Sequence, residues 1–422
     1  MSTPADPLAA ALAAQRRAFE DDRLPSAPER IRRLDALKRM LKDYRPRLTA
    51  ALTHDFSARS DTEIALAEFV PSIQHLNYLR RRVRRWMRPE RRQLPLHLRP
   101  GRAEVRYQPR GVVGIIVPFN YPVLLACAPL ATALAAGNRA LVKMPEATPE
   151  TSALMAEALA ATFNPDMVAV IEGDAETSAR FSRLPFDHLL FTGSGRVGRE
   201  VMHAAADHLT PVTLELGGKS PAIIDQGADL DEAAARICFG KSLNAGQTCV
   251  APDYVLVPRA GEAAFVEAFR RAFAQFYPAL PDNPDYGGII SDAHAERLEA
   301  LIDEARSNGA TVVRLGPSSL GGGRRLAPVL LTGVDEGMRV MREEIFGPVL
   351  PVKLYDTLED AIAYVNAHEH PLALYFFGHD RSRQRQVLDS TLSGGATIND
   401  TVVHVAADDL PFGGVGASGM GR

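Results

Sequence analysis

Residues 112–145 read VVGIIVPFNYPVLLACAPLATALAAGNRALVKMP. Two short apolar, β-branched runs at 112–118 and 139–145 flank an alanine- and leucine-rich stretch at 123–137 that ends at a glycine. Short continuous apolar runs are typical of buried strands, whereas the longer stretch is typical of a helix. A strand, a helix and a second strand in this order predict two parallel strands joined by a crossover helix.

The same alternation continues along the chain. Helical stretches near 149–163 and 174–183 are followed by strand-like runs at 166–173 and 187–193. After residue 214 a second set of strand-like runs begins, at 253–258, 310–316, 349–355, 372–378 and 395–400. Apolar strands joined by helices predict parallel sheets that are covered on both faces. We therefore predict an α/β fold with two doubly wound domains that meet near residue 215, preceded by about ninety residues that read as helical.

Composition excludes several classes of protein. The chain has 422 residues, 46% of them hydrophobic, and a formal net charge of −3, so nothing draws it as a whole to nucleic acid or to acidic membranes. One basic cluster, RRRVRRWMRPERR at 80–92, departs from that balance. We interpret it as a solvated helix face leading into a subunit contact, with polyanion binding as the alternative.

The three cysteines, Cys127, Cys238 and Cys249, show no spacing typical of a zinc site. Their sparse, odd number favours a reducing compartment over a disulfide framework. No signal peptide is recognisable, and the apolar stretch at 123–137 is shorter than the ~20 residues of a membrane-spanning helix. The sequence predicts a soluble, cytoplasmic protein without a metal site.

A glycine motif, FTGSGRVGRE at 191–200, follows a predicted strand and opens a predicted helix. Gly193, Gly195 and Gly198 would allow a phosphate to approach backbone amides at a helix N-terminus, although an ordinary turn has the same pattern. A dinucleotide-binding motif should also place an acid at the end of the next strand. The nearest acid, Glu215, lies in TLELGGKSP, where glycines and a lysine favour a catalytic turn. A bound ribose would then be held from elsewhere.

Polar residues after two other strands are candidates. Lys143 and Glu146 follow the strand at 139–145 and could hold ribose hydroxyls, where the carboxylate would repel a 2′-phosphate and favour NAD over NADP. The alternative is that both are simply solvated. Asn120 lies between two prolines after the strand at 112–118. It is either a polar turn residue or an amide donor to a developing oxyanion.

Cys249 lies in LNAGQTCVAPDYVLV at 243–257, just past a helix predicted at 229–243, with Gly246 between them. A thiol at a glycine-bearing turn is predicted to be displayed rather than packed. Cys127 and Cys238 lie inside predicted helices and are predicted to be packed in the core.

Seven motifs in order resemble the aldehyde dehydrogenase superfamily. They are PFNYP, KMPE, FTGSGRVG, LELGGKSP, NAGQTCVAPDY, EEIFGPVLPV and LPFGGVGASGMGR, spread over residues 118–422. The short N-terminal region and GQTCVAPDY resemble the class 3 branch, whose members are usually homodimers. HVAADDLPFGG and LTPVTLELGGKSP are similar to bacterial coniferyl aldehyde dehydrogenases.

The resemblance implies a domain arrangement. Residues 1–88 and 109–217 would form a Rossmann-like NAD-binding domain, and residues 218–410 the catalytic domain. Residues 89–108 would form a bridging or oligomerisation element. Family members continue beyond GASGMGR, so residues 411–422 would be only the start of a C-terminal segment.

The resemblance also implies roles. Cys249 would attack the aldehyde carbon, Asn120 and the Cys249 amide would hold the oxyanion, and Glu215 would activate water to hydrolyse the thioester. The implied contacts to NAD, or to NADP, are Lys143, Glu146, Gly193, Ser194, Val197, Gly198, Glu344 and Phe346.

The implied activity is NAD(P)-dependent oxidation of an aldehyde to a carboxylic acid, with phenylpropenals such as coniferaldehyde as expected substrates. Alternatives are a dehydrogenase of medium or long-chain aliphatic aldehydes, or one that passes the acyl group to coenzyme A. Glu215 argues against the latter. A further alternative is a crystallin-like structural protein that has lost its catalytic activity. The presence of Cys249, Glu215 and Asn120 argues against this alternative.

Overall fold

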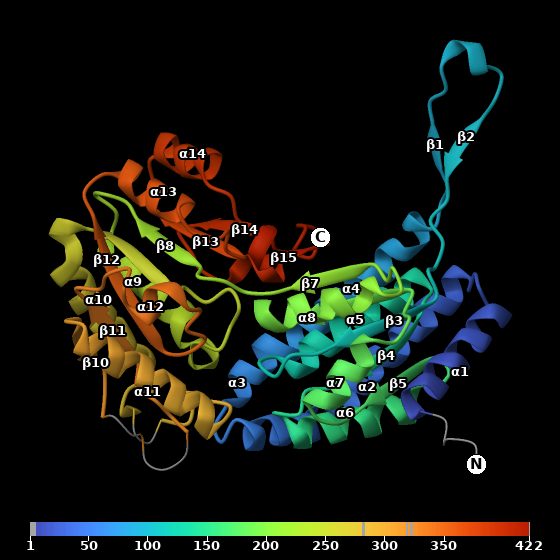
Figure 1. Ribbon diagram of the computed structural model, residues 1–422, viewed down its shortest axis with the longest axis horizontal. Coiled ribbons are helices and arrows are strands. Elements are labelled where there is room, and N and C mark those ends of the chain that lie inside the picture. The colour runs from blue at the N-terminus through green and yellow to red at the C-terminus, as the bar shows by residue number, and fades with distance from the viewer. Residues whose placement is uncertain (1–5, 281–282, 318–319, 321–323, 422) are drawn as a thin grey trace. The chain divides into compact units, whose positions relative to one another are not determined.

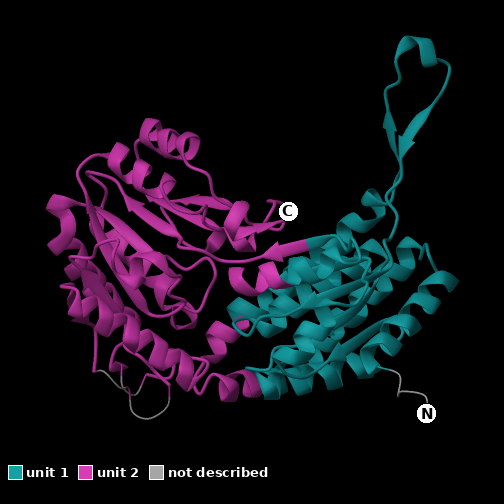
Figure 2. Cartoon of the chain, in the orientation of Figure 1, with its two compact units in different colours: residues 1–48, 66–191, 201–212 teal, residues 49–65, 192–200, 213–422 magenta. Residues whose placement is uncertain are grey.

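The computed structural model describes residues 6–280, 283–317, 320 and 324–421 (Figure 1). Arg422, the last residue of the motif at 410–422, lies outside these ranges. The chain forms two compact units, which are described separately (Figure 2). Unit 1 comprises residues 1–48, 66–191 and 201–212, and unit 2 comprises residues 49–65, 192–200 and 213–422.

The predicted strand–helix–strand unit is present in unit 1. Strands β3 (Val112–Ile116) and β4 (Arg139–Lys143) pair in parallel, and every residue in them is buried. Helix α5 (Pro122–Ala136) connects them. It begins with a proline, which is favourable in the first turn, and ends at Gly137, whose φ of 90° suits a residue without Cβ.

Strands β5 (Val168–Ile171) and β6 (His188–Thr192) extend this sheet in parallel on either side. The complete sheet has the order β15-β7-β6-β3-β4-β5, in which β15 (Gly419–Met420) is antiparallel to β7 (Val212–Glu215). The accompanying helices are α1 (Pro7–Asp21), α2 (Ala27–Asp55), α4 (Val70–Trp86), α6 (Pro149–Thr162), α7 (Ala175–Ser182) and α8 (Gly195–Ala206).

Unit 2 contains a seven-stranded sheet with the order β10-β11-β12-β9-β8-β13-β14. Its strands are β8 (Pro221–Ile224), β9 (Tyr254–Pro258), β10 (Thr311–Arg314), β11 (Val329–Thr332), β12 (Val349–Tyr355), β13 (Ala373–Phe377) and β14 (Gly395–Ile398). All neighbours pair in parallel except β10 and β11, which are antiparallel. The helices include α3 (Asp61–Ile64), α9 (Leu230–Ser242), α10 (Glu262–Phe276), α11 (Asp292–Ser307), α12 (Arg339–Arg342), α13 (Leu358–Asn366) and α14 (Arg381–Ser390). The α/β fold predicted from the sequence is confirmed.

A two-stranded hairpin follows α4 in unit 1. Strands β1 (Glu90–Arg92) and β2 (Ala103–Val105) pair in an antiparallel register (Figure 1). Leu96, between the two strands, is 80% exposed.

Two properties of the described ranges concern membrane-spanning helices and metal sites. Within them, each helix is either too short or too polar to cross a lipid bilayer. The same residues contain no group of three or more histidine, cysteine or acidic side chains arranged to hold a metal ion.

Candidate active site

The loop that carries Cys249 begins with a left-handed elbow. After α9, the residues Asn244, Ala245 and Gly246 have φ angles of 51°, 50° and 75°. A side chain at Gly246 would lie 2.4 Å from the backbone oxygen of Gly347, so only glycine fits there. Left-handed backbone costs a non-glycine residue about 1 kcal/mol, so the surroundings must hold the elbow in place.

Gln247 holds it. This buried amide donates from Nε2 to the backbone oxygens of Asn244 (3.0 Å) and Gly288 (2.9 Å), and its Oε1 accepts from the backbone N–H of Ile290 (2.9 Å). The Asn244 N–H in turn donates to Glu63 Oε2 at 3.0 Å. Sequence analysis missed Gln247, although a glutamine so close to the candidate nucleophile was an available signal.

Cys249 is partly exposed, whereas Cys127 and Cys238 are buried. The residue packs against the apolar core of unit 2, so the display of its thiol stays a prediction. Burial of its surroundings, followed by the charges of Glu344 and Glu215, raises the pKa of Cys249 to about 12. The thiol keeps its proton at neutral pH, so attack on a substrate needs a nearby group to accept that proton.

Glu215 is the last residue of β7. The glycines of the motif begin two residues later, at Gly217, and the preference for a catalytic role over a ribose contact stays a prediction. Its Oε2 is buried and has no hydrogen-bond partner within the described ranges. Burial raises the pKa of Glu215 to about 7. An acid that is half ionised near neutral pH and has an unpaired buried oxygen is suited to accept a proton.

Glu344 lies beside Gly217 and Gly218, the two glycines that follow β7. A Cβ on Gly217 would lie 2.2 Å from Glu344 Oε1, so the carboxyl packs directly on that backbone. The carboxyl also accepts from the Gly218 N–H, and burial raises its pKa to about 7. Because Glu344 and Glu215 both raise the pKa of Cys249, unit 2 brings these three predicted residues into electrostatic contact.

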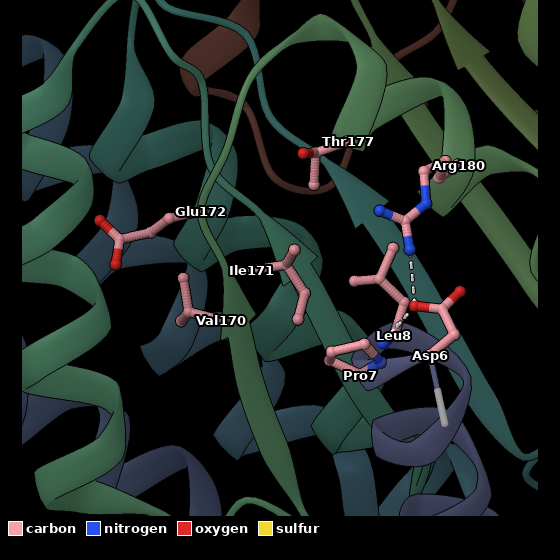
Figure 3. A pocket seen from close by; sticks show the side chains of 8 residues that line it. All are labelled: Asp6, Pro7, Leu8, Val170, Ile171, Glu172, Thr177 and Arg180. Atoms are coloured by element: carbon pink, nitrogen blue, oxygen red, sulfur yellow. Dashed lines mark hydrogen bonds and ion pairs between the residues drawn. The ribbon is translucent and has the colours of Figure 1, made fainter. Parts of the chain in front are cut away.

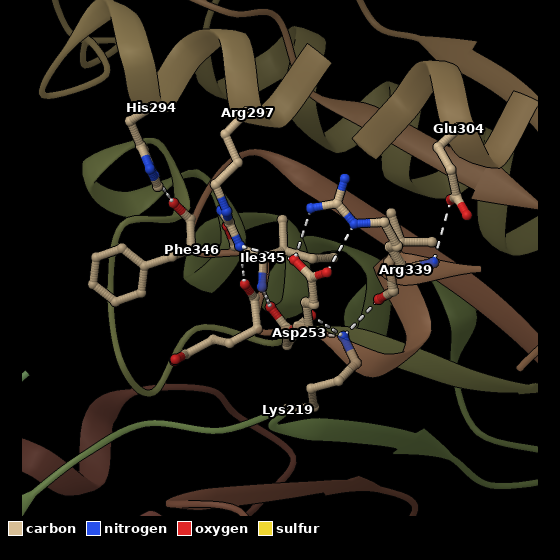
Figure 4. A network of polar contacts seen from close by, with 11 residues as sticks. Lys219, Asp253, His294, Arg297, Glu304, Arg339, Ile345 and Phe346 are labelled. Carbon is tan, nitrogen blue, oxygen red and sulfur yellow. Dashed lines mark hydrogen bonds and ion pairs between the residues drawn. The ribbon is translucent and has the colours of Figure 1, made fainter. Parts of the chain in front are cut away.

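A buried ion pair connects the three motifs that carry them. Lys219 follows Glu215 by four residues, Asp253 follows Cys249 by four residues, and the two side chains pair (Figure 4). Lys219 Nζ also donates to the backbone oxygen of Glu343 at 3.0 Å, and Asp253 Oδ1 accepts from Ile345 N at 3.1 Å. The sequence marks Lys219 only as part of the motif around Glu215, and it gives no signal for Asp253. Their partners around position 344 are too distant in sequence to produce a local pattern.

The glycine motif opens α8 as predicted. The Ser194 hydroxyl accepts from the Val197 N–H at 3.4 Å, and the Gly198 N–H donates to the Ser194 backbone oxygen at 2.9 Å. A Cβ on Gly195 would meet only Arg199 Nη1, at 3.8 Å, so the space beside this backbone is open. The Gly193 N–H donates to the Glu215 backbone oxygen at 3.0 Å and ties the motif to β7.

Lys143 and Glu146 lie together in unit 1. Lys143 ends β4 and is buried, and Nζ donates to the backbone oxygens of Met144 (2.7 Å) and Gly173 (2.8 Å). Glu146 Oε2 is 3.9 Å from Nζ, and this side chain is 55% exposed. The ammonium has three donors, of which the two carbonyls occupy two.

Asn120 lies in unit 1, in the bend between β3 and α5, and it is buried. Unit 1 also contains a cavity of about 290 Å³ that none of the predicted residues lines (Figure 3). The ion pair between Arg180 Nη2 and Asp6 Oδ1 (2.7 Å) lies at its edge.

Comparison with known proteins identifies the family. Residues 2–422 match the model of the aldehyde dehydrogenase family. The chain is 53% identical over 415 residues to a "Probable coniferyl aldehyde dehydrogenase" of Pseudomonas aeruginosa, covering 98% of this chain and 87% of that protein. It is 45% identical over 422 residues to the coniferyl aldehyde dehydrogenase of a Pseudomonas species, covering 99% and 87%.

Solved structures agree. The substrate-bound state of Staphylococcus aureus AldH superimposes with a TM-score of 0.95 at 37% identity, over 99% of this chain and 90% of the other. The Mycobacterium tuberculosis aldehyde dehydrogenase complexed with NAD+ gives a TM-score of 0.89 at 34% identity, over 98% and 86%. This chain belongs to the aldehyde dehydrogenase family and is an aldehyde dehydrogenase.

Proposed function

We propose that this enzyme oxidises aromatic aldehydes of the coniferaldehyde type to carboxylic acids through a thioester on Cys249. Two observations on neighbouring groups support the mechanism: the charge of Glu215 raises the pKa of the half-buried Cys249, and Glu215 Oε2 is buried without a hydrogen-bond partner among the described residues. The observation that carries the substrate class is the identity of 45–53% to proteins named for coniferyl aldehyde.

In the first half-reaction Cys249 Sγ forms a bond to the aldehyde carbon, and the carbonyl oxygen becomes an oxyanion in a thiohemiacetal. The thiol proton leaves to a nearby base as the bond forms. The Asn120 amide and the Cys249 backbone N–H donate to the oxyanion, and each such donor typically lowers the barrier by a few kcal/mol.

Bound NAD(P)+ supplies a two-electron acceptor for the hydride that leaves the thiohemiacetal carbon. Glu215 then acts in the hydrolysis of the thioester. Its carboxylate takes a proton from a water molecule, the water oxygen attacks the thioester carbon, and the C–S bond breaks to release the carboxylic acid. A carboxyl with a pKa of about 7 is matched to this task at neutral pH.

The residues present fit a dinucleotide. The open backbone at Gly195, at the start of α8, is a place where a pyrophosphate would lie, with Gly193, Ser194, Val197 and Gly198 around it. The remaining Lys143 donor and the exposed Glu146 carboxylate would hold the adenosine ribose. Glu344 and Phe346 would hold the nicotinamide ribose and ring.

Cofactor preference provides one prediction. Glu146→Gln is expected to raise kcat/KM with NADP relative to NAD by about tenfold, because the exposed carboxylate that repels a 2′-phosphate is removed. Steady-state kinetics with both cofactors at low ionic strength measures the ratio. Glu157→Gln is the matched control, since its exposed carboxylate pairs with Arg47 instead. An unchanged ratio in Glu146→Gln would show that this residue does not face the 2′ position.

Substrate class is tested by comparing kcat/KM for coniferaldehyde, benzaldehyde, hexanal and succinic semialdehyde with NAD and with NADP. We expect the two aromatic aldehydes to exceed hexanal at least tenfold. A preference for hexanal would indicate an aliphatic aldehyde dehydrogenase, and a preference for the semialdehyde would contradict the proposal.

We further propose that the enzyme acts as a homodimer in the cytoplasm. The exposed leucines of the β1–β2 hairpin, Leu96 and Leu98, support an intersubunit contact. The three cysteines are free thiols, which fits a reducing compartment. Sedimentation velocity of the purified chain measures the oligomeric state.

A further inference from the structure

The turn at residues 343–346 is held by side chains from helix α11. Arg297 donates from Nη2 to the Glu344 backbone oxygen (2.6 Å) and from Nη1 to the Ile345 backbone oxygen (2.9 Å). His294 Nε2 lies 2.7 Å from the Phe346 backbone oxygen, and since a carbonyl only accepts, the imidazole is the donor. Figure 4 shows both side chains reaching from α11 to this turn.

The opposite side of the turn is held as well. Lys219 donates to the Glu343 backbone oxygen, and Asp253 accepts from the Ile345 N–H. Four consecutive carbonyls, from 343 to 346, therefore accept from basic side chains. Such a run of side-chain donors is unusual for a four-residue turn, whose carbonyls ordinarily bond to water or to other backbone groups.

The turn also contains backbone strain. Phe346 has a φ of 53°, in the left-handed region that a bulky aromatic residue rarely adopts. Such strain persists only where neighbouring contacts fix it, and it occurs preferentially at functional sites. The His294 ring lies against the Phe346 ring at 6.4 Å with an angle of 75° between the planes, so the backbone and the ring of Phe346 share one partner.

We propose that His294 and Arg297 are positioning residues for hydride transfer, because they fix the turn that presents Glu344 and Phe346. The inference rests on the proposed function, in which these two residues contact the nicotinamide ribose and ring. Small displacements of a reacting group lower rates strongly, so a loosened turn slows the transfer although no reacting atom is removed. Neither His294 nor Arg297 takes part in the attack by Cys249 or in the activation of water by Glu215.

Two reactions of the same thiol separate this role from a general structural one. Aldehyde oxidation moves a hydride, with its two electrons, from the thiohemiacetal carbon to NAD+. Hydrolysis of 4-nitrophenyl acetate moves none: Cys249 Sγ displaces 4-nitrophenolate, and water activated by Glu215 then releases acetate from the thioester. Loss of positioning reduces the first reaction and spares the second.

The experiment compares His294→Leu with His294→Gln, and Arg297→Met with the unaltered enzyme. Glutamine retains an N–H at a reach similar to that of Nε2, whereas leucine does not. Stopped-flow measurement of the first turnover at saturating NAD+ and coniferaldehyde gives the rate of NADH formation. We expect about a tenfold loss in His294→Leu and in Arg297→Met, and a rate within about twofold of the unaltered enzyme in His294→Gln. Ester hydrolysis without cofactor should stay within about twofold in all three.

Arg306→Met is the matched control, because Arg306 lies on the same helix and pairs with Asp303 rather than with the turn. It should leave both reactions unchanged. The inference is overturned if hydride transfer is unchanged in His294→Leu and Arg297→Met, or if ester hydrolysis falls in parallel with it. If the unaltered enzyme shows no ester hydrolysis that depends on Cys249, the proposed function itself fails, and the inference with it.

Discussion

Replacing Cys249 by alanine is expected to lower kcat/KM for aldehyde oxidation about ten-thousandfold or more, because no other nucleophile replaces the thiol. Hydrolysis of 4-nitrophenyl acetate should disappear with it. Steady-state assays at saturating NAD+ measure both losses, and circular dichroism confirms that the variant is folded. A variant that retains a tenth of the original activity would show that Cys249 is not the nucleophile.

The other two thiols provide the control. Cys127 and Cys238 are buried, so Cys127→Ala and Cys238→Ala remove a thiol from the core and not from the site. Each should retain full activity and lose about 1 kcal/mol of stability from the small cavity created. The double variant leaves Cys249 as the single thiol. Its reaction with iodoacetamide should accelerate as the pH rises from 7 to 10, because the raised pKa keeps the thiol protonated at neutral pH.

Replacing Glu215 by glutamine is expected to lower steady-state turnover a hundredfold to about ten-thousandfold, while a first burst of NADH remains. Glutamine preserves the shape of the side chain but accepts no proton from water, so the thioester accumulates. Quench-flow measurement should find close to one NADH per subunit in the burst. Glu267→Gln, which removes an exposed carboxylate of α10, is the control and should turn over normally. Undiminished turnover in Glu215→Gln would contradict its assignment as the base.

For Glu215→Gln we predict how thioester hydrolysis and folding stability depend on pH. In the unaltered enzyme, hydrolysis of the thioester should rise as the pH increases through about 7, where Glu215 ionises, and the variant should lack this limb. Because burial raises the folded-state pKa, the contribution of Glu215 to stability is fully present below its ordinary value and is lost as the pH rises through 7. Glu215→Gln should therefore be more stable than the unaltered chain at pH 8, by at most about 3 kcal/mol, and no more stable at pH 4.

The thioester that accumulates in Glu215→Gln also tests whether water or coenzyme A is the acyl acceptor. If the enzyme passed its acyl group to coenzyme A, adding this thiol would restore turnover to the Glu215→Gln variant in full. We expect no restoration, because the buried, unpaired carboxyl oxygen of Glu215 is suited to activating water.

The sequence predicted those parts of the fold that have a local pattern. The strands β3 and β4 are continuous apolar runs, and α5 between them begins at a proline and ends at a glycine, so their order along the chain specifies a parallel pair. The end of α9 before Cys249 was predictable for a similar reason, since a glycine follows the last helical residues.

Other parts have no such pattern. Strand β11 has only four residues between Pro328 and Gly333, too few for a recognisable periodicity, and it was missed. The end of β7 at Glu215 is likewise set by pairing with Gly419, about two hundred residues further along the chain. A contact between residues so far apart in sequence leaves no signal in either segment.

The contacts around the site were unpredictable for the same reason. Asp253 and Ile345 are separated by 92 positions, and Gln247 and Gly288 by 41. A single sequence displays such residues only as isolated polar side chains, which are ordinarily solvated. The resemblance to a known family implied roles for Cys249 and Glu215, but it implied none for the side chains that contact their motifs.

Because residues 244–246 have left-handed backbone, the catalytic activity of the enzyme should be less resistant to heating than its fold. Asn244 and Ala245 would gain about 1 kcal/mol each by reverting to right-handed backbone, and the hydrogen bonds of Gln247 and of the Asn244 N–H to Glu63 oppose this. Local loss of these bonds would displace the cysteine while both sheets remain intact. We therefore expect activity to be lost on heating before the global unfolding transition, which parallel assays of activity and circular dichroism measure.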